Sequence, residues 1–79
     1  MNDIEFKATL QMLIPMIIQI IIDKRRIPVI TAINLLYLSG LYEKLEEENT
    51  KLWHLSPLAL FELLEIELET GKLVFPTEV

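Results

Sequence analysis

His54 is the side chain of this sequence best suited to acid–base chemistry, because an imidazole titrates near neutral pH. It is the single histidine of the chain. A general base also needs an orienting partner and a nucleophile within hydrogen-bonding reach. Ser56 follows two residues later, but Ser56-Pro57 has the pattern of a helix start, and the chain contains no cysteine. We therefore expect a structural or surface role for His54 and predict that the protein is not an enzyme.

Carboxylates are the other side chains that could take part in chemistry, as metal ligands. The absence of cysteine excludes zinc sites built on thiolates, and a single histidine leaves only carboxylates beside it. The run Glu46-Glu47-Glu48 lacks the alternating oxygen spacing of a calcium loop. We predict that the protein binds no metal and no cofactor, and that this run forms a solvated surface.

The balance of charge argues against nucleic acid as a partner. Twelve Asp and Glu residues outnumber seven Lys and Arg residues and give a formal net charge of −5 at pH 7. Phosphate backbones are bound by clustered cations, and the basic cluster here is the short run Lys24-Arg25-Arg26. The absence of cysteine fits a reducing compartment, so we expect a cytoplasmic protein.

The elements that must position these residues are helices. Cap residues and breaks in the apolar pattern predict helices at about residues 3–23, 30–38, 40–48 and 57–70, in a single domain spanning residues 1–79. A short apolar tail, residues 73–76, is expected to fold back onto them. The predicted caps and stops are Asn2 with Glu5, Thr31, Ser39, Asn49, Ser56 with Pro57, and Gly71.

The first helix is long and strongly apolar. Together with Pro15, its polar residues fall on one i,i+4 row that forms a narrow stripe: Lys7, Gln11, Gln19 and Asp23. A helix with so little polar surface is normally central or at an interface. Because proline removes a helical hydrogen bond, we expect either a kink over residues 11–15 or two shorter helices. The isoleucine-rich segment 17–22 would also suit a strand, although length favours a helix.

The apolar content points to contacts with another chain. Hydrophobic residues make up 52% of only 79 residues, and a small domain has proportionally more surface to cover with polar groups. Apolar residues of the first helix face several directions, so we expect Ile17 and Ile21 to pack against a second copy or a partner. Met12 and Met16, one turn apart, indicate either an adaptable binding groove or the filling of gaps in a core.

Trp53 and Glu67 complete the set of candidate interface residues. Trp53 stands in a predicted connector, where it either fills the core between the third and fourth helices or anchors a partner. Glu67 falls among Leu60, Leu63 and Leu64 when residues are placed at 100° steps around the fourth helix. We expect its carboxylate to lie at the rim, or to meet Arg25, Arg26 or a cation of a partner.

The apolar segment 10–22 raises the alternatives of a signal peptide and a membrane span. A signal peptide needs a basic N-terminal region, whereas residues 1–9 contain Asp3 and Glu5 against Lys7. A span needs about 20 apolar residues, and polar residues interrupt and end this stretch. We therefore favour a buried helix over a membrane helix.

Two segments resemble a family of small uncharacterised proteins of Gram-positive bacteria. They are residues 43–57, EKLEEENTKLWHLSP, and residues 69–76, ETGKLVFP, and the region 37–42 adds to the likeness. The resemblance covers roughly the second half of the chain. It implies a gene near toxin–antitoxin-like genes, and it transfers no functional residue, because the family has no assigned activity.

These observations predict an all-α protein, a small bundle of three to four helices. We hypothesise a non-enzymatic protein–protein interaction module, either a homo-oligomer or one half of a two-gene, antitoxin-like system. Its candidate interface residues are Met12, Met16, Ile17, Ile21, Trp53 and Glu67. The alternative hypothesis is a membrane-associated small protein that inserts residues 10–22. A small enzyme would require a pocket that holds His54 beside a carboxylate.

Overall fold

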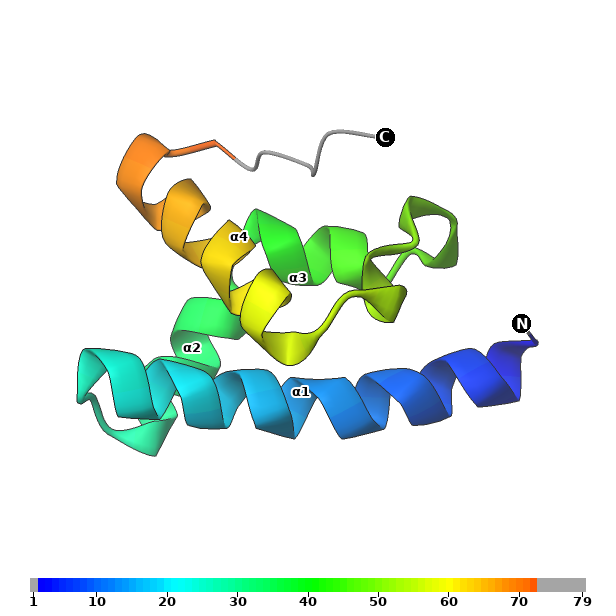
Figure 1. Ribbon diagram of the computed structural model, residues 1–79, viewed down its shortest axis with the longest axis horizontal. Helices are drawn as coiled ribbons and strands as arrows, with labels where there is room; N and C mark the ends of the chain where they lie inside the picture. Colours follow the sequence, from blue (N-terminus) through cyan, green and yellow to red (C-terminus); the bar gives the residue numbers. More distant parts are fainter. Residues whose placement is uncertain (1, 73–79) are drawn as a thin grey trace.

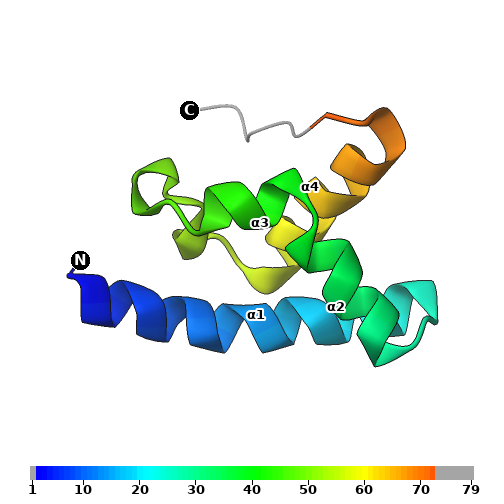
Figure 2. The ribbon, with the colours of Figure 1, turned by 180° about the vertical axis from the view of Figure 1, so that it is seen from behind.

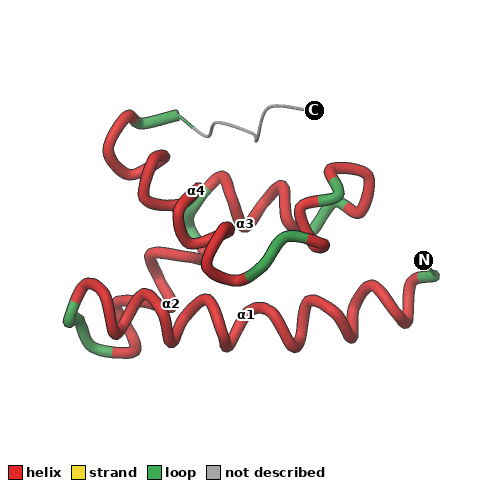
Figure 3. The backbone as a smooth tube through the Cα atoms, viewed as in Figure 1, coloured by secondary structure: helices red, strands yellow, loops and turns green. Residues whose placement is uncertain are grey.

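Helices form wherever the sequence combines apolar periodicity with a cap. The computed structural model describes residues 2–72, so the predicted tail at residues 73–76 lies outside the described residues. The described chain contains α1 (Asp3–Arg25), α2 (Val29–Tyr37), α3 (Gly40–Leu45) and α4 (Pro57–Thr70), shown in Figure 1. Two short 3-10 helices, Glu48–Thr50 and Leu52–His54, link α3 to α4, and the described part contains no strand (Figure 3). The prediction of an all-α bundle is confirmed.

Most of the predicted helix ends are confirmed by local hydrogen bonds. The Asn2 side chain accepts from the Glu5 amide at 2.8 Å, and Glu5 accepts from the Asn2 amide in return, which completes a capping box. Ser39 and Ser56 cap α3 and α4 through their hydroxyl oxygens. Gly71 ends α4 with a left-handed φ of 78°, a conformation that glycine adopts without a steric penalty.

The predicted cap Thr31 and the predicted stop Asn49 are wrong, whereas a start of the second helix near Val29 agrees with the sequence pattern. α2 begins at Val29 with Pro28 as its N-cap, and Thr31 lies inside the helix, because the proline ring already holds the extended conformation that a cap requires. α3 ends at Leu45, and the left-handed residue that follows is Lys51, with φ of 59°, instead of Asn49. The Thr50 hydroxyl donates to the carbonyls of both Lys44 and Glu47 at 2.8 Å, which holds this segment in a 3-10 turn.

Pro15 does not divide the first helix. α1 runs from Asp3 to Arg25 without a break, so the alternative of two shorter helices is wrong. Pro15 has no amide hydrogen and therefore leaves the carbonyl of Gln11 without its helical donor. Both residues are exposed, so water can satisfy that carbonyl, and the helix continues.

Replacing Pro15 with alanine should raise the free energy of unfolding by about 1–3 kcal/mol. Proline costs about 3 kcal/mol relative to alanine inside a helix, and its restriction of the unfolded chain offsets about 1 kcal/mol of that cost. Urea denaturation followed by circular dichroism measures the change. Gln11→Ala, on the same exposed row, is the control, with an expected effect within about 0.5 kcal/mol. A loss of stability in Pro15→Ala would show that the packing of α1 depends on the proline.

The core lies between α1 on one side and α3 and α4 on the other. Figures 1 and 2 show α1 along one edge of the molecule, with α2 leading from its C-terminal end to α3. α1 packs mainly against α4 and α2. All buried residues except Phe6 form one cluster: Ile17, Ile21, Ala32, Leu36, Leu41, Leu45, Leu52, Leu60, Phe61, Leu63 and Leu64. The overall extents of 35 × 26 × 19 Å leave every helix with an exposed side.

Candidate interaction surface

α1 has one buried and one exposed side, and the predicted interface residues divide between them. Ile17 and Ile21 are 0% exposed in the core of the single chain. Met12 and Met16 are 70% and 52% exposed on the opposite side. The prediction that Ile17 and Ile21 contact a second chain is therefore wrong. Of the two expectations for the first helix, a central position or a position at an interface, the exposed side of α1 leaves the second as a prediction. The polar stripe is too narrow to cover the solvent side of the helix, and the methionines occupy the remainder.

α2 adds an exposed apolar surface that the sequence analysis missed. Ile30 is 65% exposed and Tyr37 is 47% exposed, and the two lie two turns apart on one side of the helix. Residues 8–22 and 27–42 contain no charged side chain and no histidine. Because exposed helix faces normally carry charged residues, these two uncharged stretches are the sequence pattern that could have identified the surface.

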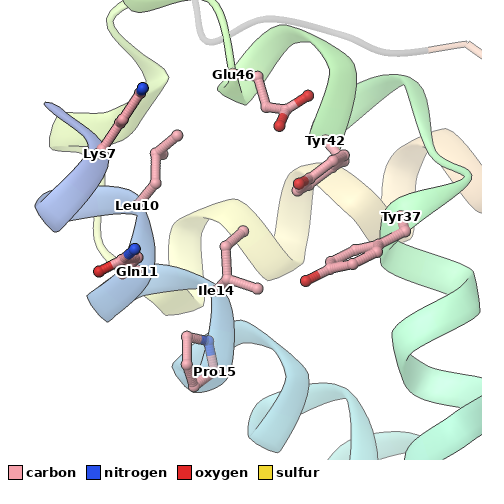
Figure 4. Close-up of a pocket in the computed structure, with 8 residues that line it drawn as sticks. All are labelled: Lys7, Leu10, Gln11, Ile14, Pro15, Tyr37, Tyr42 and Glu46. Atoms are coloured by element: carbon pink, nitrogen blue, oxygen red, sulfur yellow. The ribbon is translucent and has the colours of Figure 1, made fainter. Parts of the chain in front are cut away.

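A shallow depression of about 380 Å³ joins the two helices (Figure 4). On one side the rings of Tyr37 and Tyr42 stack, with centroids 4.6 Å apart and an interplanar angle of 24°. Figure 4 shows both hydroxyl groups directed toward α1. The full lining is Lys7, Leu10, Gln11, Ile14, Pro15, Tyr37, Tyr42 and Glu46. Tyr37 of α2 and Pro15 of α1 therefore line the same depression, and Met12, Met16 and Ile30 lie outside its lining.

We refer to the exposed, uncharged side of these two helices as the α1–α2 face and define it by Met12, Pro15, Met16, Ile30 and Tyr37. All five residues are exposed, and none carries a charge. On α1 the exposed residues Gln11 and Gln19 stand on either side of Pro15 in the polar row, and Asp23 continues that row. Lys7 and Glu46 lie at one end of the depression.

Tyr42 supplies a hydroxyl donor at this border. Burial raises the pKa of Tyr42 above its ordinary value of 10.0, and a hydrogen bond to Glu46 together with the negative charge of Glu46 raises it further. The phenol therefore stays protonated throughout the neutral pH range. The depression thus combines the apolar side chains of Leu10 and Ile14 with a protonated phenol, a carboxylate and an ammonium group.

Trp53 is half-buried and is held by its own chain. Its indole Nε1 donates to the carbonyl of Glu48 at 2.9 Å, and the ring packs against the core. Trp53 lies in the connector between α3 and α4. Its packing against the core agrees with the first of its two predicted roles, which is to fill the core between these helices. The hydrogen bond and the packing account for the side chain without a partner.

Glu67 caps α3 from α4. Its two carboxylate oxygens accept from the amides of Gly40 at 2.7 Å and of Leu41 at 3.0 Å. The prediction that Glu67 meets Arg25, Arg26 or a cation of a partner is therefore wrong. Arg25 instead forms a bidentate pair with Glu65, with Nε to Oε2 at 2.7 Å. The position of Glu67 on the inward side of α4 was predicted correctly, but its partner is the backbone of a helix end.

His54 is exposed and makes a local contact between its Nδ1 and the carbonyl of Lys51. It lines neither the depression beside Tyr37 nor a second one, between α2 and the end of α4. Among residues 2–72, no group of three or more His, Cys, Asp or Glu side chains is placed to hold a metal ion. Neither of these two depressions places His54 beside a carboxylate.

Comparisons of the chain with protein-family models, with curated proteins and with solved structures found no match. The fold is a small all-α bundle whose first two helices leave the apolar side chains of Met12, Met16, Ile30 and Tyr37 exposed. Inference about its function starts from the α1–α2 face.

Proposed function

We propose that the protein is a non-enzymatic protein–protein interaction module of the cytoplasm, which acts as an oligomer or as one half of a two-gene system. The observation that carries this proposal is the exposure of the α1–α2 face, where Met12 is 70% and Ile30 is 65% exposed. Continuous apolar surfaces on small proteins mark sites of interaction, and flexible methionines suit an adaptable contact. The resemblance to proteins encoded near toxin–antitoxin-like genes supports the two-gene form.

The proposal predicts that the binding of a partner depends on the two methionines of α1. An affinity-tagged chain, cross-linked in its host cell and purified, should recover a protein that is lost when Met12 and Met16 are both replaced by glutamate. We expect recovery to fall at least about tenfold, because each carboxylate would be buried without a partner. The recovered protein is either another copy of the chain, distinguished by a second tag, or a different protein, identified by mass spectrometry.

Leu38→Glu is the matched control for this experiment. Leu38 is 86% exposed, so the same substitution there introduces the same charge without affecting the core, and it lies outside the α1–α2 face. Recovery should be unchanged in this variant. If no protein, including the chain itself, depended on Met12 and Met16 for its recovery, the proposed function would be wrong.

A specific observation also supports the alternative of membrane association. α1 is long and apolar enough to cross a membrane, with a mean hydropathy of 1.5 over a stretch of which only 17% is buried. Core helices and signal sequences share these properties. Fractionation of cells without detergent separates the two proposals. An interaction module is expected in the supernatant after the membranes are pelleted, whereas an inserted protein stays in the pellet.

A further inference from the structure

We propose that Met12 and Met16 form a site of reversible oxidation, at which a peroxide makes the exposed side of α1 polar and leaves the fold intact. The proposal goes beyond the interaction function, because its chemistry needs no partner. Met12 and Met16 are the methionines of residues 2–72, and the chain contains no cysteine. Their thioether sulfurs are therefore the atoms of the described residues that a peroxide oxidises most readily.

The reaction is the transfer of one oxygen atom. A lone pair of the methionine sulfur attacks one oxygen of hydrogen peroxide, the O–O bond breaks, and a sulfur–oxygen bond forms. The sulfur is oxidised to a sulfoxide, and the second peroxide oxygen leaves with both protons as water. Because the oxidant must reach the sulfur, the reaction depends on exposure, and Met12 and Met16 are 70% and 52% exposed.

The neighbours of the two sulfurs explain why oxidation changes the surface of α1. The exposed side chains within residues 9–23 are Gln11, Met12, Pro15, Met16, Gln19 and Asp23. The two methionines are thus apolar side chains in a strip that otherwise contains two amides, a carboxylate and a proline. A sulfoxide is polar, so oxidation of both methionines leaves Pro15 as the one exposed apolar residue of this stretch.

The core depends on neither sulfur. Ile17 and Ile21 are 0% exposed on the opposite side of α1, and the buried cluster contains no methionine. A sulfoxide inside a core disrupts its packing, whereas at positions 12 and 16 the added oxygen can be hydrated. We therefore expect oxidation of both sulfurs to lower the melting temperature by no more than about 8 °C, as for two surface substitutions in a domain of this size.

Oxidation also has a consequence for the proposed interaction. Both methionines belong to the α1–α2 face, so a partner bound there should shield the sulfurs from peroxide. Sulfoxides already present in the free chain should weaken the binding of that partner, because a polar group would be buried without a hydrogen-bond partner. This consequence rests on the proposed function, whereas the oxidation itself does not.

Treatment of the purified chain with hydrogen peroxide, followed by peptide mapping with mass spectrometry, tests the proposal. Both side chains should gain one oxygen atom, each at a rate within about fivefold of its rate in the urea-unfolded chain. The helical circular dichroism signal should persist, and retention on a hydrophobic-interaction column should fall. Methionine sulfoxide reductases specific for the two sulfoxide epimers should restore the retention.

The double variant Met12→Leu/Met16→Leu is the matched control. Leucine keeps the apolar surface and nearly the same volume but has no sulfur, so peroxide should leave most of the retention of this variant unchanged. Any effect of oxidation at another residue persists in the variant and can be subtracted.

Three results would overturn the proposal. The first is oxidation in the folded chain that is more than about fivefold slower than in the unfolded chain, which would show that the sulfurs are covered. The second is a loss of the helical signal on oxidation. The third is an equal fall in retention in the double leucine variant. A partner whose recovery is unchanged when both sulfoxides are present would instead contradict the proposed function, and the oxidation site would stand.

Discussion

Replacing Ile17 with alanine should lower the free energy of unfolding by about 2–5 kcal/mol, the range found when a large aliphatic side chain is removed from a packed core. Ile17 is 0% exposed and lies in the middle of the cluster that joins α1 to α2, α3 and α4. A chain of 79 residues has a total stability on the order of 4–12 kcal/mol. This one change should therefore remove a large part of it, which chemical denaturation at a fixed protein concentration would measure.

Met12→Ala is the matched control on the same helix. Met12 is 70% exposed, so its truncation should change the free energy of unfolding of the monomer by no more than about 0.5 kcal/mol. Equal and small effects of the two substitutions would show that Ile17 is not in the core, contrary to the structure.

The parts of the fold that follow from local sequence could be predicted. The caps at Asn2, Ser39 and Ser56 each depend on residues no more than three positions apart, so the sequence contains both partners of every hydrogen bond. The stop at Gly71 depends on a backbone conformation that glycine adopts readily. The all-α class followed from such ends together with the length of the apolar stretches between them.

The orientation of α1 could not be predicted, because its apolar residues surround most of the helix. Periodicity shows that Ile17 and Ile21 share one side of the helix and that Met12 and Met16 share another, but not which side meets the core. The core in fact lies opposite the methionines, and Tyr37 of α2 lines the same depression as Pro15. These choices depend on where α2 and α4 pack, which is a property of the whole chain.

Contacts between residues far apart in the sequence could not be predicted either. The sequence showed that the Glu67 carboxylate needs a partner on the inward side of α4, and charge suggested Arg25 or Arg26. The partner proved to be the amides of Gly40 and Leu41, more than 25 positions away. Every residue except proline carries a backbone amide, so no residue type marks the end of α3 as the partner of Glu67.

Replacing Glu67 with alanine should lower the free energy of unfolding by about 1–3 kcal/mol. The substitution leaves the amides of Gly40 and Leu41 at the start of α3 without acceptors. Hydrogen bonds from such amides to a charged group contribute about this much to the free energy of unfolding. Ser39 still accepts from the Tyr42 amide at 3.0 Å, so the third amide of the helix keeps its cap. Glu69→Ala, an exposed position on the same helix, removes the same charge and should change stability by no more than about 0.5 kcal/mol.

A double-mutant cycle with Gly40 isolates the contact itself. A Cβ at position 40 would lie 3.0 Å from the Glu67 Oε2, so in the unmodified chain Gly40→Ala must displace the carboxylate that caps the helix. In the Glu67→Ala background that crowding is gone, and alanine should stabilise α3 by about 0.5–1 kcal/mol relative to glycine. Gly40→Ala should therefore be neutral or destabilising with Glu67 present and stabilising without it. Equal effects in the two backgrounds would mean that Glu67 and the start of α3 do not interact, because independent sites contribute additively.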